Sequence, residues 1–119
     1  MRTRRTSAVL SALLAGLVMG APAAEAATVK TVSMTTAKTF SPKTVTVARG
    51  TLVRWTNPRS LLGSTHTTTS MTGLWDSKSV QQGTSFSRTF SKAGTFRYRC
   101  TLHSNAAGTT GMTGTVVVR

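Results

Sequence analysis

From about position 29 onward, apolar and polar residues alternate with a period of two, as they do in strands with one buried face. No stretch repeats the helical spacing of apolar residues over three turns. Gly, Pro and Asn interrupt the alternation at short intervals, where turns are expected. The predicted strands are 29–34, 43–47, 52–56, 65–70, 84–90, 95–100 and 113–118. Seven to eight short strands predict an all-β fold, a two-sheet antiparallel Greek-key sandwich.

The same alternation assigns each side chain to one face of its strand. Phe96, Tyr98 and Cys100 share a face, and so do Val53 and Trp55. The residues between them are mostly Thr and Arg. We therefore expect an apolar interior, with most of the basic side chains on the outside of the sandwich.

The N-terminal segment has the three parts of an export signal. Arginines at positions 2, 4 and 5 precede an apolar run, and Ala24 and Ala26 then form an Ala-x-Ala site. The pattern predicts a secretory signal peptide at 1–26 and one mature domain at 27–119. The alternative is an uncleaved amphipathic helix.

Export would place the mature domain in a periplasmic or extracellular space, and the sequence does not distinguish between the two. The pair Arg4-Arg5 leaves both the general and the twin-arginine export routes open. No apolar run reaches the roughly 18 residues that a membrane-spanning helix needs. We therefore expect no transmembrane span, and a single domain of this size is expected to be a monomer.

The chain is strongly basic, with 15 Lys and Arg against 2 acidic residues and a formal charge of +13. Removing residues 1–26 takes away three arginines and Glu25, which leaves +11 with Asp76 as the remaining acid. Such a charge would steer an acidic redox partner, or it would serve solubility and contact with an anionic envelope. Nucleic acid is not an expected partner, because the basic residues are spread along the strands without a recognisable reading motif.

The residues best suited to bind a metal are the single cysteine, Cys100, and the two histidines, His66 and His103. Met112 follows downstream at the start of an alternating strand. One thiolate, two imidazoles and a thioether on a sandwich are the ligand set of a mononuclear blue-copper site. These ligands suit both Cu(I) and Cu(II), so little reorganises when an electron moves. Taken singly, each residue would more often be structural.

The mature chain resembles the cupredoxins, and within them the plastocyanin and amicyanin-like group. The resemblance covers nearly the whole mature chain and keeps all four ligand types in the family's order. It implies that His66, Cys100, His103 and Met112 hold one type 1 copper ion. The positions that carry it are Phe40-Ser41-Pro42, Val45, Val47, Gly50-Thr51, Val53, Trp55, Asn57, His66-Thr67, Gly73-Leu74-Trp75-Asp76-Ser77, Gly83, Phe86, Phe90, Gly94-Thr95-Phe96, Tyr98, Cys100-Thr101-Leu102-His103, Met112, Gly114, Val116 and Val118.

The chain departs from the family pattern at two places. Residues 104–111 form a longer loop between His103 and Met112 than family members commonly have. Arg99 precedes Cys100, where the photosynthetic plastocyanins carry a tyrosine. Thr67 and Thr101, next to two of the ligands, either hydrogen-bond the opposite ligand loop or are ordinary strand threonines.

The expected function is a one-electron carrier that cycles between Cu(I) and Cu(II) and passes electrons to a docked partner at His103. We expect no enzymatic activity, because the sequence contains no nucleophile–base pair and no paired carboxylates. The alternatives are an extracytoplasmic copper-binding or delivery protein that uses the same site, and a metal-free adhesion sandwich. The sequence names neither the redox partner nor the reduction potential.

Overall fold

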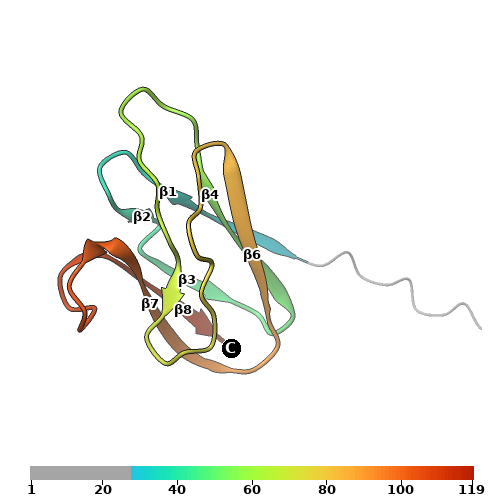
Figure 1. Ribbon diagram of the computed structural model, residues 1–119. Coiled ribbons are helices and arrows are strands. Elements are labelled where there is room, and N and C mark those ends of the chain that lie inside the picture. The colour runs from blue at the N-terminus through green and yellow to red at the C-terminus, as the bar shows by residue number, and fades with distance from the viewer. Residues whose placement is uncertain (1–27) are drawn as a thin grey trace, which may run out of the picture.

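The computed structural model describes residues 28–119, so the predicted signal peptide lies outside the described residues. The described chain folds into two four-stranded sheets that pack face to face (Figure 1). One sheet has the order β2-β1-β4-β6 and the other β3-β8-β7-β5. The strands are β1 Val29–Met34, β2 Phe40–Ser41, β3 Thr44–Val47, β4 Thr51–Asn57, β5 Thr69–Ser70, β6 Thr84–Phe90, β7 Gly94–Ser104 and β8 Gly111–Val118.

The prediction of an all-β, two-sheet sandwich with seven to eight strands is confirmed. Its antiparallel part needs correction, because each sheet is mixed: β1 pairs with β4 in parallel, and β3 pairs with β8 in parallel. Side chains alternate with a period of two in both kinds of pairing, so the sequence pattern does not distinguish them. In the described part of the chain, no helix is long and apolar enough to cross a membrane.

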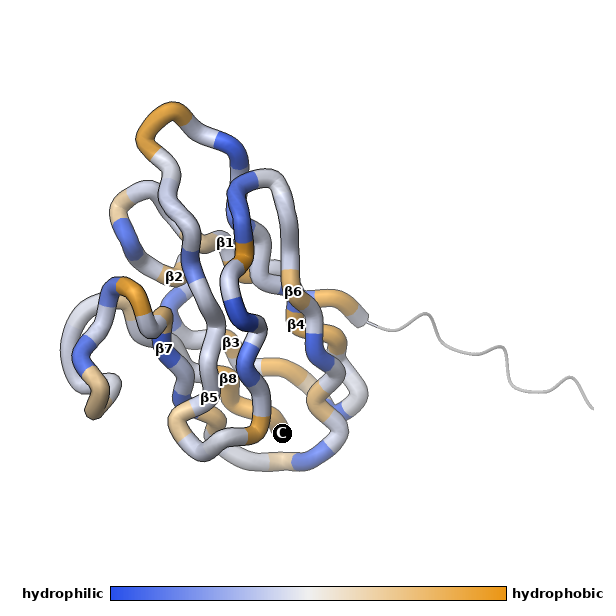
Figure 2. The backbone as a smooth tube through the Cα atoms, in the orientation of Figure 1, coloured by the Kyte–Doolittle hydropathy of each residue, from blue (hydrophilic) through white to orange (hydrophobic). Residues whose placement is uncertain are grey.

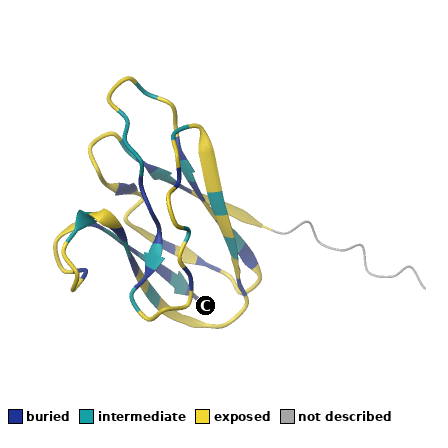
Figure 3. Ribbon diagram, viewed as in Figure 1, coloured by how far each residue is buried: buried dark blue, intermediate teal, exposed yellow. Residues whose placement is uncertain are grey.

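The core lies between the sheets, where the buried strand positions gather (Figure 3). Aromatic rings fill much of it. Val53 and Trp55 on β4 are fully buried, and Tyr98 on β7 approaches Trp55 edge-on with ring centroids 5.3 Å apart. Trp75 stacks at a tilt on Trp55 from the loop after β5. The predicted inward face of 95–100 is also confirmed, because Cys100 has no exposed surface.

Two predicted strands differ from the structure by four residues at one end. Of the predicted strand 65–70, only Thr69–Ser70 joins a sheet, as β5, while His66 forms an isolated bridge with Val80. β7 runs on to Ser104, beyond the predicted end at Cys100. Both differences concern the segments that carry the candidate ligands, so the ligand loops depart from regular sheet pairing.

Candidate metal centre

Two segments bring three of the candidate ligands together. His66 lies before β5, where its backbone N–H and C=O both bond Val80, at 3.2 and 2.7 Å. Cys100 and His103 lie near the end of β7. There the pairing with β8 shifts between Arg99 and Ser104. This irregularity frees the segment that contains Cys100 and His103 from the ladder, so that both side chains turn toward His66.

The donor atoms of His66, Cys100 and His103 all lie within 4.8 Å of one another. The two histidine Nδ1 atoms are 3.2 Å apart, and Cys100 Sγ is 3.9 Å from Nδ1 of His66 and 3.4 Å from Nδ1 of His103. A point equidistant from the three atoms is about 2 Å from each, and metal–nitrogen and metal–sulfur bonds are about 2.0–2.3 Å for zinc. A three-donor His₂Cys set is that of blue-copper sites. The residues therefore fit one copper ion.

Burial distinguishes the two histidines. His66 is 1% exposed and Cys100 is fully buried, whereas His103 is half-buried and reaches the surface. Burial lowers the pKa of both histidines from the usual 6.5, and the charge of Lys38 lowers both further. At neutral pH both imidazoles are therefore neutral, which is the form that binds a metal.

Hydrogen bonds join the His66 segment to the Cys100 segment. The backbone N–H of Thr67 donates to Cys100 Sγ at 3.3 Å. In return, the backbone N–H of Thr101 donates to Thr67 Oγ1 at 2.9 Å, and the two threonine hydroxyls lie 3.2 Å apart. The prediction that these threonines hydrogen-bond the opposite ligand loop is thus confirmed over the alternative of ordinary strand threonines.

Asn57 also shapes the site, and sequence reasoning gave it no role there. Its side chain is 2% exposed, and its Nδ2 donates to the carbonyls of Ser64 at 2.8 Å and Val80 at 2.9 Å. Because Val80 also pairs with His66, this amide anchors the segment that positions the first histidine. The available signal was a polar residue at an inward position at the end of a strand.

The long loop before Met112 is closed by its own hydrogen bonds. Asn105 Oδ1 accepts the backbone N–H groups of Thr109 at 2.8 Å and Thr110 at 3.1 Å. The strands on either side meet where Ser104 pairs with Gly111. Met112 follows at once and is 1% exposed. Residues 105–110 therefore return the chain to the end of β7, although the loop is long.

Exposed leucines occur in the loop between β4 and β5 and on β7. Leu61 and Leu62 are almost fully exposed in the loop between β4 and β5, which extends away from the sandwich (Figure 2). Leu102, next to His103, is 57% exposed. The described surface next to the half-buried histidine thus carries an apolar group.

Comparison with known proteins bears directly on these observations. The family model for the cupredoxin-like domain matches residues 9–118. The chain belongs to the cupredoxin-like domain family. A reduced Cu(I) form of an amicyanin proline-to-glycine variant is 26% identical, with a TM-score of 0.62 over 83% of this chain and 88% of that one. A reduced tryptophan-to-tyrosine variant of amicyanin is 23% identical, with a TM-score of 0.65 over 79% and 85%, and shows likeness of fold. The resemblance stated from the sequence is confirmed.

Proposed function

We propose that this cupredoxin is a one-electron carrier, not an enzyme, and that it holds one type 1 copper ion between His66, Cys100 and His103. The observation that carries the proposal is the triangle of two Nδ1 atoms and one Sγ, with sides of 3.2, 3.4 and 3.9 Å. Copper bound there supplies a Cu(I)/Cu(II) couple. The similar amicyanin structures include a Cu(I) form and an oxidised form, in support of that couple.

The residues around the triangle suit a site that changes little between oxidation states. With copper bound, the N–H of Thr67 would donate to the Cys100 sulfur in both oxidation states. The bond from Thr101 N–H to Thr67 Oγ1 holds the two ligand segments in one arrangement. Because the ligand positions are fixed by protein hydrogen bonds, we expect little reorganisation when an electron is gained or lost.

Met112 is the proposed fourth, axial ligand. Its support is its burial and its place on β8 directly after the Ser104–Gly111 pair. His103 is the proposed point of electron exchange, because it is the ligand that reaches the surface. A partner that docks over His103 and Leu102 would come close to the metal without entering the core.

The cellular setting is part of the proposal. We propose that residues 1–26 are removed on export and that 27–119 act as a monomer in a periplasmic or extracellular space. The mature charge of +11 supports an acidic redox protein as the partner. Intact mass measurement of the protein isolated from its source tests the cleavage after Ala26, and a mass that includes residues 1–26 contradicts it.

The decisive experiment is a pair of visible and electron-spin spectra after one equivalent of Cu(II) is added. We expect a strong thiolate-to-copper band with narrow copper hyperfine splitting, and Cys100→Ser should abolish the band. Thr46→Ser, on the outer face of β3, is the control and should leave it unchanged. A pale tetragonal spectrum, or a band that survives in Cys100→Ser, would overturn the proposed ligand set. Stoichiometric loss of copper to an acceptor without reversible redox would favour copper delivery.

A further inference from the structure

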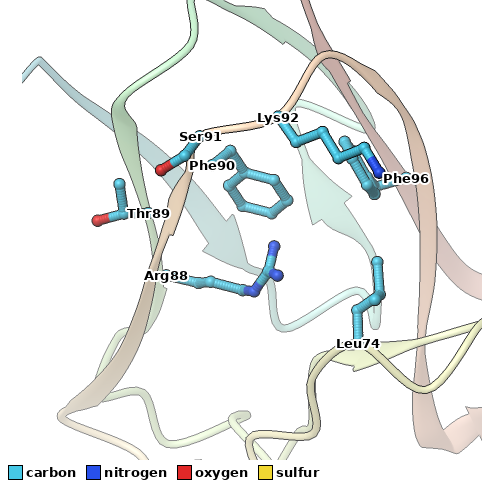
Figure 4. Close-up of a pocket in the computed structure, with 7 residues that line it drawn as sticks. All are labelled: Leu74, Arg88, Thr89, Phe90, Ser91, Lys92 and Phe96. Carbon is cyan, nitrogen blue, oxygen red and sulfur yellow. The ribbon is translucent and has the colours of Figure 1, made fainter.

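We propose that a pocket beside β6 binds a small carboxylate that carries a flat apolar body. The pocket has a volume of about 250 Å³ and lies between the end of β6, the start of β7 and the loop after β5 (Figure 4). Its lining residues are Leu74, Arg88, Thr89, Phe90, Ser91, Lys92 and Phe96.

Arg88 is a charged residue on a strand face where the other inward positions are apolar. On β6 it lies between Phe86 and Phe90 on the same face, and it pairs in register with Val53, which is fully buried. The side chain therefore belongs to the inward face of the sheet, where apolar residues are expected. β6 is an edge strand. An inward charge can protect such an edge from pairing with another chain, and this is the alternative role that the experiment must exclude.

Two aromatic rings hold the Arg88 guanidinium in place. Its central carbon lies 5.1 Å from the ring centroid of Trp75 and 4.7 Å from that of Phe90. Contacts of this kind fix the plane of the group while its N–H donors stay available. A planar guanidinium with a fixed orientation is suited to bind a carboxylate through two parallel hydrogen bonds.

Arg88 also lacks an acidic partner within residues 28–119. Asp76 is the one acidic side chain in that part of the protein, and it pairs with Lys78 at 3.2 Å. Lys92 adds a second positive group to the same pocket (Figure 4). The pocket lining thus contains two positively charged side chains and no carboxylate, which favours an anionic ligand.

The walls and the volume define the rest of the ligand. Leu74, Phe90 and Phe96 provide apolar surface around the charged groups. A dry cavity of about 150 Å³ holds benzene, whereas drug-sized ligands occupy about 300–1,000 Å³. A volume of about 250 Å³ therefore suits one ring with a carboxylate attached.

This pocket shares no residue with the metal group. Phe96 and Cys100 lie on the same strand, and at about 3.3 Å per residue their backbones are about 13 Å apart. Ligand binding in this pocket therefore does not depend on copper binding or on electron transfer.

The test is an NMR titration of the purified protein, in metal-free and Cu(I)-loaded forms, with sodium benzoate. We expect saturable shifts of the Arg88 side-chain N–H, the Trp75 indole N–H and the Phe96 ring in both forms. Benzamide has the same ring without the charge, and acetate has the charge without the ring. Each should bind at least tenfold more weakly than benzoate.

Arg88→Met keeps an unbranched side chain over the rings and removes the charge, so it should weaken benzoate binding at least tenfold. Arg54→Met is the matched control, because Arg54 is exposed on the neighbouring strand, and it should bind as the unmodified protein does. Lys92→Met, at an exposed position, should weaken binding severalfold without disturbing the core. The proposal is wrong if benzoate causes no saturable shift. It is also wrong if benzamide binds as tightly as benzoate and Arg88→Met binds benzoate as tightly as the unmodified protein does. Arg88 then serves as edge protection.

Discussion

Among single residues, Met112 allows the sharpest test of the metal centre. A thioether stabilises Cu(II) more than an alkyl group does, so Met112→Leu should raise the reduction potential if Met112 is axial. A tenfold change in relative affinity for the two oxidation states corresponds to about 59 mV for one electron, and we expect a shift of that order. Met34→Leu makes the same change at a 1% exposed position on β1 and is the control. Equal potentials in both variants would remove Met112 from the ligand set.

The two histidines make the stability of the metal-free protein depend on pH. Burial places their folded-state pKa values below the usual 6.5, which the unfolded chain retains. As the pH falls below about 6.5, the unfolded state takes up protons first. The stabilising contribution of the neutral imidazoles is therefore complete above that pH and is lost as the pH falls through the folded-state values.

Urea unfolding of the metal-free protein between pH 7.5 and 5 measures this effect. The unfolding midpoint should decrease toward low pH, and the decrease should be smaller in the double variant His66→Gln/His103→Gln. A decrease of equal size in the double variant would assign the pH dependence to other groups.

The sequence predicted His66, Cys100 and His103 as ligands because these residue types are rare in the chain and their chemistry is specific. It also offered hydrogen bonds from Thr67 and Thr101 to the opposite ligand loop, since each follows a predicted ligand. It gave no role in the site to Asn57, which holds the His66 segment from nine residues upstream. The role of Asn57 depends on where Ser64 and Val80 lie in space, and that is set by packing across the chain.

At the level of elements, the loop between β7 and β8 controls where Met112 lies. Asn105→Ala removes the acceptor for two backbone N–H groups and the donor to Thr109 Oγ1 at 2.7 Å. At a typical net value of about 1 kcal/mol per bond, less at this exposed site, the loop should open more often. Amide hydrogen exchange at Thr109 and Thr110 should accelerate severalfold. Asn105→Asp keeps the acceptor oxygen and should retain most of the protection.

The outcome for the Asn105 variants distinguishes two accounts of the loop. If exchange is unchanged in Asn105→Ala, backbone contacts close the loop, namely the Ser104–Gly111 pair and the bond from Asn105 N–H to the Thr110 carbonyl. If exchange accelerates and the reduction potential also changes, the hydrogen bonds of Asn105 help to place Met112.

Strand prediction succeeded where one face is buried along a regular ladder. β1 and β6 have the predicted bounds. The two-residue strand β2 was missed, since it is too short to show a period. The parallel pairing of β1 with β4 was missed as well, because it depends on the route of the chain between the sheets.

For the whole molecule, the positive charge should govern association rates. Most of the basic side chains are exposed, so they create a positive potential around the described domain. Salt screens such a field over about 10 Å at 0.1 M ionic strength. The rate of electron exchange should therefore depend on the charge of the reagent and on salt in a predictable direction.

Stopped-flow kinetics with small redox reagents of opposite charge measure this dependence without a natural partner. From 10 to 200 mM salt, the rate with an anionic reagent should fall severalfold, because screening removes the attraction. The rate with a cationic reagent should rise, because screening removes the repulsion. Lys38→Gln should weaken both trends more than Lys43→Gln does, since the charge of Lys38 acts on both histidines and therefore lies near the proposed point of electron exchange. Equal salt dependence for the two reagents would show that the positive charge does not direct approach to the metal, and its role would then be sought in solubility or in contact with an anionic envelope.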